Sequence, residues 1–235
     1  MGRQTAFVTG AEGGLGRAVA LALARRGWQV VAVVQRGRGG GPAADELRQA
    51  GGALRTVTAN VARRAELEQA LDVVDHFGGT LRLLLPAAEV VHRAPFAEMN
   101  PRHWQEMVEV NLMGLFHTVQ ASLPLMEGGG HIFLPAGVAD GRQGAPSWAV
   151  YGATKAALRG FADALRDELR PRRIRVTLLT VGGAEGETPA AASLAPDHIA
   201  PWILHVLDHP EVSVEEVHIL PLAGGPAGER PPAGR

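Results

Sequence analysis

The sequence predicts an α/β fold, in which a doubly wound parallel sheet of seven strands carries helices on both faces. Short apolar runs alternate with amphipathic segments, and a glycine-rich turn joins the first run to the first segment. Hydrophobic residues make up 46% of the 235 residues, which is enough to bury one large core. Because strands separated by helices pair in parallel through right-handed crossovers, the alternation favours a single domain.

The expected strands are short runs of β-branched and other apolar residues bounded by glycine or polar residues. They lie near residues 6–8, 30–34, 55–59, 81–85, 131–134, 174–179 and 217–220. Their nearly continuous apolar character predicts burial on both faces of the sheet. A glycine run at residues 128–130 breaks the chain just before the fifth strand.

Amphipathic segments between these runs predict the helices. They lie at about residues 15–26, 43–50, 63–76, 148–169 and 196–207, and a long helix begins at residue 100. Asn100 suits the N-cap of that helix and Pro101 its first position. The predicted domain spans residues 1–223. Residues 224–235 are rich in Gly and Pro without apolar anchors, so we expect a disordered tail.

Composition limits the classes of function. The net charge is −1 and the signs are interleaved, which argues against a nucleic-acid or membrane surface. The absence of cysteine excludes disulfides and thiolate zinc sites, and His205 and His209 lack a third ligand, so no metal site is expected. The start of the chain has no signal-peptide layout, and no apolar run approaches the ~18 residues of a spanning helix. We therefore expect a cytoplasmic protein with a small-molecule substrate.

A glycine-rich turn at residues 9–16 lies between the first strand and the first helix. Gly10 suits the tight turn, while Gly14 and Gly16 allow backbone and helix to approach a pyrophosphate at the helix N-terminus. A merely flexible turn is the alternative. The setting between a strand and a helix favours a dinucleotide.

The end of the second strand indicates which dinucleotide binds. A carboxylate there would hold the ribose hydroxyls, whereas a cation would favour a 2′-phosphate. No acid follows Val34, and Arg36 and Arg38 lie within reach of a phosphate. The prediction is NADP(H), with NAD(H) possible; the alternative is that both arginines are ordinary solvated charges.

Tyr151 and Lys155 are the only tyrosine and the only lysine of the chain, and they lie four residues apart. On a helix this spacing places them on one face. An ammonium next to a phenol stabilises the phenolate and lowers its pKa from ~10, which suits the phenol for acid–base catalysis. The pair therefore predicts proton transfer at a carbonyl or alcohol oxygen.

At these motifs the sequence resembles the short-chain dehydrogenase/reductase family from Thr9 to about Leu222. The matching pieces are TGAEGGLG at residues 9–16, VNLMG at 110–114 and YGATK at 151–155, in that order. The resemblance implies a single-domain Rossmann fold and NAD(P)(H)-dependent interconversion of carbonyls and alcohols. It also implies a homo-oligomer, a dimer or a homotetramer.

The resemblance assigns roles to individual residues. Tyr151 is the implied acid–base residue, Lys155 also binds the nicotinamide ribose, and Asn111 holds a water that connects Lys155 to solvent. The predicted cofactor contacts are Thr9, Gly10, Gly14, Leu15, Gly16, Arg36, Asn60, Val61, Ala88, Tyr151, Lys155 and Gly182. The predicted substrate contacts are Gly137, Ser147 and Trp148, and residues 182–196 occupy the position of the family's substrate lid.

Several positions depart from the family pattern. The usual serine after the fifth strand is absent from residues 134–140, and Ser147 is the nearest replacement. A positioned donor to a developing oxyanion contributes ~10²–10³ in rate, so its loss bears on activity. The usual Asn-Asn-Ala-Gly after the fourth strand reads Pro-Ala-Ala-Glu at residues 86–89, and Asn60 replaces an adenine-facing aspartate.

Two functions follow from these observations. The first is an NADP(H)-dependent carbonyl reductase or alcohol dehydrogenase that uses Tyr151, Lys155 and Asn111, with Ser147 or a main-chain N–H replacing the serine. The second is a non-catalytic dinucleotide-binding protein, a sensor or structural partner, which the missing serine motivates. Methyl transfer on a similar sheet would not explain the Tyr/Lys pair.

Overall fold

The computed structural model describes residues 4–35, 42–50, 53–77, 80–137, 146–182 and 194–220, with the backbone alone at residues 42–44. Several predictions fall outside these residues. They concern Arg36 and Arg38, the segment of the missing serine beyond Gly137, most of the lid, and the tail at 224–235.

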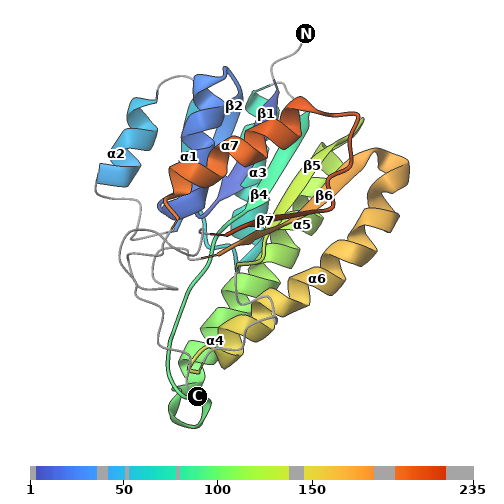
Figure 1. Cartoon of the computed structure of the whole chain (residues 1–235). Coiled ribbons are helices and arrows are strands. Elements are labelled where there is room, and N and C mark those ends of the chain that lie inside the picture. Colours follow the sequence, from blue (N-terminus) through green and yellow to red (C-terminus); the bar gives the residue numbers. More distant parts are fainter. Residues whose placement is uncertain are drawn as a thin grey trace, which may run out of the picture.

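A parallel sheet of seven strands forms the centre of the molecule, in the order β3-β2-β1-β4-β5-β6-β7 (Figure 1). The strands are β1 Thr5–Thr9, β2 Gln29–Val34, β3 Leu54–Thr58, β4 Leu81–Pro86, β5 Gly130–Pro135, β6 Ile174–Val181 and β7 Glu216–Ile219. The predicted seven-stranded parallel sheet is confirmed. The order of the strands reverses between β1 and β4: β2 and β3 lie on one side of β1, and β4 to β7 lie on the other. Ligands of such sheets bind at this switch point.

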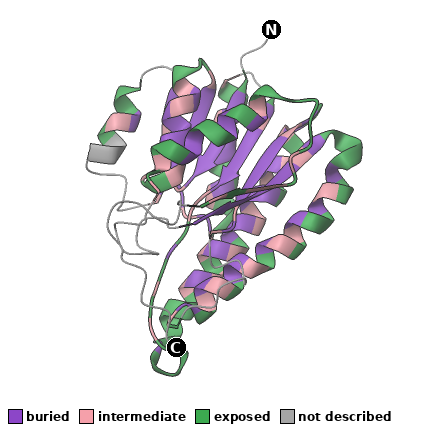
Figure 2. Ribbon diagram, viewed as in Figure 1, coloured by how far each residue is buried: buried purple, intermediate pink, exposed green. Residues whose placement is uncertain are grey.

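Helices cover both faces of the sheet. They are α1 Gly14–Arg25, α2 Pro42–Gln49, α3 Arg64–His76, α4 Pro101–Val108, α5 Leu115–Ser122, α6 Ala149–Leu169 and α7 Pro196–Asp208. Apolar side chains of α3, α5 and α6 pack in one core, and those of α1, α2 and α7 in a second core on the opposite face. The five inner strands β1, β2, β4, β5 and β6 are buried along most of their length, whereas the edge strands β3 and β7 are partly exposed (Figure 2).

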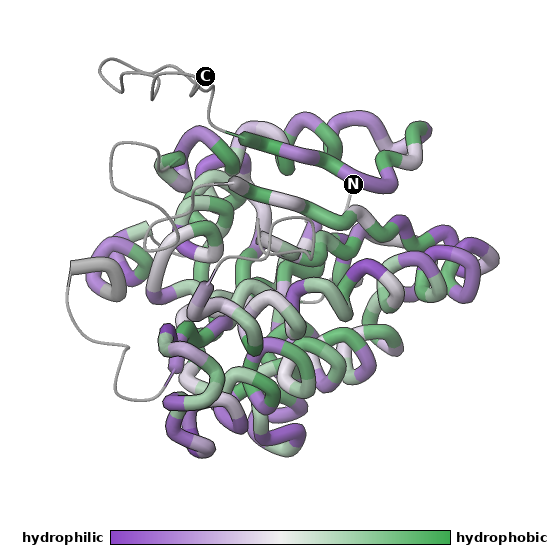
Figure 3. Tube along the Cα trace, turned by 60° about the horizontal axis from the view of Figure 1, so that its bottom comes forward, coloured by the Kyte–Doolittle hydropathy of each residue, from purple (hydrophilic) through white to green (hydrophobic). Residues whose placement is uncertain are grey.

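The helices bury one face and expose the other, because hydrophobic and hydrophilic residues alternate along them (Figure 3). Asn100 caps α4 as expected: its Oδ1 accepts a hydrogen bond from the Arg102 N–H at 2.9 Å, and Pro101 is the first helical residue. Among the described residues, no helix is long and apolar enough to cross a membrane.

One segment departs from the predicted regular helix. Between α4 and α5, residues Glu109–Gly114 (η2) form a π-helical segment, which carries Asn111. Such segments are rare and occur frequently at functional sites. Gly114 allows this segment to approach the loop after β3, because a Cβ there would lie 2.7 Å from Val61 Cγ2. The segment therefore places Asn111 near the carboxyl ends of the strands.

Candidate active site

A cavity of about 340 Å³ opens at the carboxyl ends of the strands and is called the main cavity here. Its walls come from the glycine turn, the segments after β4 and β5, the first turns of α6, and the junction of β6 with α7. The lining residues are Gly10, Glu12, Gly13, Gly14, Leu15, Ala87, Glu89, Pro135, Gly137, Tyr151, Lys155, Leu179, Val181, Leu194, Pro196 and Ile199. The fold thus brings the predicted dinucleotide turn and the Tyr/Lys pair to one cavity.

The glycine turn is held tightly against the end of β4. Gly10 has φ +66°, and a Cβ there would lie 2.4 Å from the carbonyl oxygen of Ala87. A Cβ on Gly16 would lie 2.4 Å from the carbonyl oxygen of Gly10. Thr9 Oγ1 accepts a hydrogen bond from the Ala88 N–H at 3.2 Å. These contacts leave no room for larger residues and place the N-terminus of α1 beside the cavity, where it suits a pyrophosphate.

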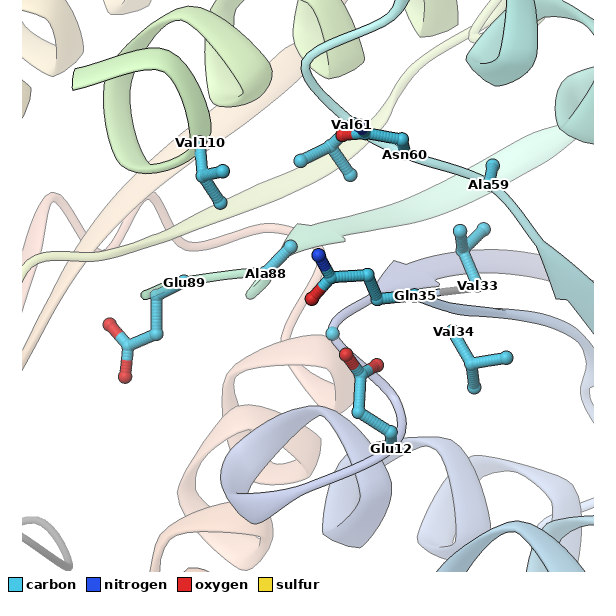
Figure 4. A pocket seen from close by; sticks show the side chains of 11 residues that line it. Glu12, Val33, Val34, Gln35, Ala59, Asn60, Val61, Ala88, Glu89 and Val110 are labelled. Carbon is cyan, nitrogen blue, oxygen red and sulfur yellow. The ribbon is translucent and has the colours of Figure 1, made fainter. Parts of the chain in front are cut away.

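A second hollow, the side recess, lies between the glycine turn and the ends of β2 and β3 (Figure 4). It is lined by Gly10, Glu12, Val33, Val34, Gln35, Ala59, Asn60, Val61, Ala88, Glu89 and Val110. The predicted contacts Asn60, Val61 and Ala88 therefore lie together. Asn60 Oδ1 already accepts a hydrogen bond from the Ala62 N–H at 3.0 Å, which leaves it one further lone pair for an adenine amine.

Glu12 is an acid at this site that the sequence analysis missed. Its carboxylate and the amide of Gln35 project into the side recess (Figure 4), and Glu12 Oε2 is buried and has no hydrogen-bond partner within the described part of the chain. An acid was expected only at the end of the second strand, where Gln35 is neutral. The acid comes instead from the glycine turn, and its position inside TGAEGGLG was the available signal.

Tyr151 and Lys155 point toward the same part of the main cavity. Both are buried, with 1% and 5% of their surface exposed, and the Lys155 Nζ lies 5.4 Å from the centre of the Tyr151 ring. The ammonium also donates a hydrogen bond to the Pro135 carbonyl oxygen at 3.1 Å. The Trp148 ring meets the Tyr151 ring edge-on at 5.3 Å. This arrangement can present a phenol hydroxyl and a fixed positive charge to a bound molecule.

Glu89 completes this group, and the sequence analysis did not assign its side chain. Its Oε2 lies 2.7 Å from Lys155 Nζ and accepts a hydrogen bond from the Tyr151 hydroxyl at 3.3 Å. Desolvation inside the cavity raises the pKa of the partly exposed Glu89 carboxyl, but the charge of Lys155 and the hydrogen bonds from Lys155 and Tyr151 outweigh it and hold that pKa below its ordinary value. Glu89 is therefore ionised near neutral pH. The sequence did contain a signal for this role, because Glu89 stands where the family pattern has glycine.

Asn111 holds the backbone next to Glu89. Its Oδ1 accepts from the Val90 N–H at 2.8 Å, and its Nδ2 donates to the Val90 carbonyl oxygen at 2.9 Å. Asn111 is 3% exposed, so these bonds are shielded from water. Both polar atoms of the side chain are thus engaged with the loop after β4. Each atom keeps one further hydrogen-bonding position, and the water next to Lys155 that the resemblance implied stays a prediction.

The remaining predicted residues divide between the cavity and its surroundings. Gly137 lines the main cavity, whereas Ser147 and Trp148 are not among its lining residues. Ser147 adopts φ +70°, a left-handed conformation uncommon for serine. The Gly182 N–H donates to the Ile219 carbonyl oxygen at 2.8 Å and so joins the end of β6 to β7. Within the described residues, no group of three or more His, Cys, Asp or Glu side chains could hold a metal ion.

Comparison with known proteins identifies the family. A family model described as short chain dehydrogenase matches residues 4–198. An uncharacterized oxidoreductase of Staphylococcus epidermidis is 31% identical over 231 residues, which cover 93% of this chain and 97% of the relative. The chain therefore belongs to the short-chain dehydrogenase family, and it is an NAD(P)-dependent oxidoreductase. The resemblance stated from the motifs is confirmed.

Solved structures share the whole fold. Serine dehydrogenase from Escherichia coli superimposes with a TM-score of 0.82 at 25% identity, covering 94% of this chain and 99% of that one. A short-chain dehydrogenase/reductase from Brucella melitensis, described as a glucose/ribitol dehydrogenase, has a TM-score of 0.81 at 27% identity, covering 92% and 94%. The substrates in these names belong to those proteins.

Proposed function

We propose that this chain interconverts a small carbonyl compound and its alcohol with NADP(H), and that Tyr151 transfers the proton. One observation carries this proposal: the buried Tyr151 hydroxyl and the Lys155 ammonium face the same cavity as the glycine turn. In carbonyl reduction, Tyr151 donates its proton to the carbonyl oxygen. In alcohol oxidation, it accepts the hydroxyl proton.

The residues present fit a dinucleotide. The glycine turn and the N-terminus of α1 would hold the pyrophosphate, the side recess with Asn60, Val61 and Ala88 the adenosine, and Lys155 the nicotinamide ribose. When bound, the dinucleotide supplies or accepts the hydride. Gly137 lines the cavity where the family serine is missing, so a main-chain N–H in this region is our candidate for holding the substrate oxygen.

The NADP(H) preference rests on Arg36 and Arg38, which would pair with a 2′-phosphate. Glu12 opposes it, because its carboxylate projects into the side recess proposed for the adenosine and suits ribose hydroxyls. NAD(H) therefore remains the alternative cofactor. The ratio of the dissociation constants of NADPH and NADH measures whether the two arginines or Glu12 dominate.

Turnover tests the proposed reaction directly. NADPH and NADH oxidation are followed with a panel of ketones and quinones, for the wild type and for Tyr151→Phe. Turnover that Tyr151→Phe abolishes supports the proposal. Tight dinucleotide binding without turnover of any compound would contradict it and favour the non-catalytic alternative.

Exposed apolar side chains support a homo-oligomer, with a homotetramer as our proposal. Trp104 on α4 and Met113 in the π-helical segment η2 are 37% and 43% exposed, and Trp202 on α7 is 53% exposed. The α4 helix packs against α6, which covers the face of the sheet opposite to α7, so two separate contacts between copies are feasible. Light scattering during size-exclusion chromatography tests this: a mass near that of one chain, 24.7 kDa, would contradict it. The cytoplasmic location stays a prediction.

A further inference from the structure

We infer that Glu89 competes with the dinucleotide for Lys155 and Tyr151, and that the cofactor displaces its carboxylate on binding. The inference rests on the proposed function, in which Lys155 binds the ribose next to the nicotinamide. It goes further, because it assigns an opposing role to a side chain of this chain. The geometry of three named groups carries it.

The first step concerns the hydrogen bonds of Lys155. An ammonium has three N–H donors. One of them binds Glu89 Oε2 at 2.7 Å and another the Pro135 carbonyl oxygen at 3.1 Å. The same Glu89 oxygen accepts from the Tyr151 hydroxyl. A ribose hydroxyl that bridges Lys155 and Tyr151 in the same way would take the place of Glu89 Oε2.

The second step concerns which partner moves. The Lys155 side chain is 6% exposed and is fixed in the wall of the cavity, whereas the Glu89 side chain is 41% exposed and faces the open space. Asn111 holds the backbone of the following residue, Val90, by two hydrogen bonds. The backbone near Glu89 is thus anchored while its side chain borders the cavity. Rotation of the carboxylate toward solvent, rather than movement of the ammonium, opens the pair.

The third step is electrostatic. Glu89 and Glu12 both line the main cavity and the side recess, so a dinucleotide that spans the two hollows passes both carboxylates. Lys155 is the positive side chain among the described residues that line the two hollows, and Glu89 neutralises it in the free protein. The anionic cofactor gains the attraction of Lys155 only after Glu89 has moved away. Glu89 therefore lowers cofactor affinity.

Dissociation constants of NADPH and NADH for Glu89→Gln and Glu89→Gly test the inference, measured by cofactor fluorescence and by calorimetry. We expect both variants to bind at least one dinucleotide about tenfold more tightly or better, the scale of a charged hydrogen bond. If Glu89 only stabilised the pocket, both substitutions would weaken dinucleotide binding instead. Glu168→Gln, an exposed acid on α6 that does not line either hollow, is the matched control and should leave both constants unchanged.

Two further variants separate the contact from general charge. In a Lys155→Met background, Glu89→Gln should give little or no gain, because the competition acts through Lys155. Glu12→Gln removes a carboxylate that does not contact Lys155, and its gain should persist in the same background. If Glu89→Gln tightens binding equally with and without Lys155, the inference is wrong. It is also wrong if both Glu89 variants unfold at the wild-type melting temperature and yet bind the dinucleotides no more tightly than the wild type.

The binding assay is independent of turnover. Tighter binding by the Glu89 variants without any Tyr151-dependent turnover would support the competition and contradict the proposed reaction. Tyr151-dependent turnover together with unchanged dinucleotide affinity in the Glu89 variants would support the proposed reaction and contradict the competition. If neither the wild type nor the Glu89 variants bind either dinucleotide, the inference is wrong.

Discussion

Lys155 Nζ and Glu89 Oε2 lie 2.7 Å apart although the two residues come from separate elements, α6 and the segment after β4. The parallel sheet brings them together, because the carboxyl ends of its strands meet at one edge. The only lysine of the chain thus has an anionic partner in the cavity that it shares with Tyr151.

Tyr151→Phe should lower turnover by about 10²–10⁴-fold, because it removes the proton donor and leaves the ring in place. The Trp148 contact is retained, so the melting temperature should change little. Initial rates of NAD(P)H oxidation and thermal unfolding measure the two effects. Residual activity close to that of the wild type would mean that another group transfers the proton.

Asn111→Ala should destabilise the fold by about 2–4 kcal/mol, because it leaves the buried N–H and carbonyl groups of Val90 without these partners. Denaturant unfolding measures the loss. Gln120→Ala is the control, since the Gln120 side chain binds Arg64 at an exposed position and should matter by less than about 1 kcal/mol. Equal effects of the two substitutions would contradict the anchoring role of Asn111.

Gly10→Ala should prevent dinucleotide binding and destabilise the protein by about 2 kcal/mol or more, because φ is +66° and the added Cβ would meet Ala87. Gly160→Ala is the matched control. Gly160 lies within α6 with open space around it, so alanine there should stabilise by about 0.5–1 kcal/mol. Calorimetric binding and unfolding curves distinguish the two sites.

Glu12→Gln should increase affinity for NADPH more than for NADH, by about tenfold in the ratio of dissociation constants at low salt. The neutral amide no longer repels a 2′-phosphate, while it still hydrogen-bonds ribose hydroxyls. Arg36→Ala should move the ratio in the other direction. An unchanged ratio in both variants would place the selectivity elsewhere.

Stability should depend on pH through Glu216. Arg159 binds its carboxylate through two nitrogens, and this hydrogen bonding lowers the pKa of Glu216 from 4.5 to about 2. Since the folded-state pKa is depressed, the contribution is complete above pH 4.5 and disappears as the pH falls toward 2. Because the pair is partly solvated, we expect Glu216→Gln to cost about 1 kcal/mol at pH 7 and almost nothing near pH 2. Urea unfolding at several pH values measures this difference.

Much of the fold could be predicted because periodicity and capping are local. Each of the seven expected strands overlaps an observed strand, and the Asn100 cap forms as expected. The π-helical segment could not be predicted in this way. It coincides with the close approach of Gly114 to Val61, a tertiary contact that the neighbouring residues in the sequence do not reveal.

The site was predicted only in part. Tyr151, Lys155 and Gly10 lie in motifs whose spacing brings them to one cavity. The contacts of Glu89 and the orientation of Glu12 depend on which way a side chain turns within a folded pocket, and sequence spacing does not contain that information. The sequence shows glutamate at residue 89 where the family pattern has glycine, but it does not show that the carboxylate lies against Lys155 and Tyr151.

The buried lysine has a practical consequence. Apart from the amino terminus, the chain offers amine-specific reagents one target, and in the free protein that target is shielded by a carboxylate. The rate at which the Lys155 amine is acylated therefore measures how often the carboxylate moves away and the pocket opens. A lysine-specific protease likewise has one cleavage point, within α6, so fragments appear only when that helix unravels.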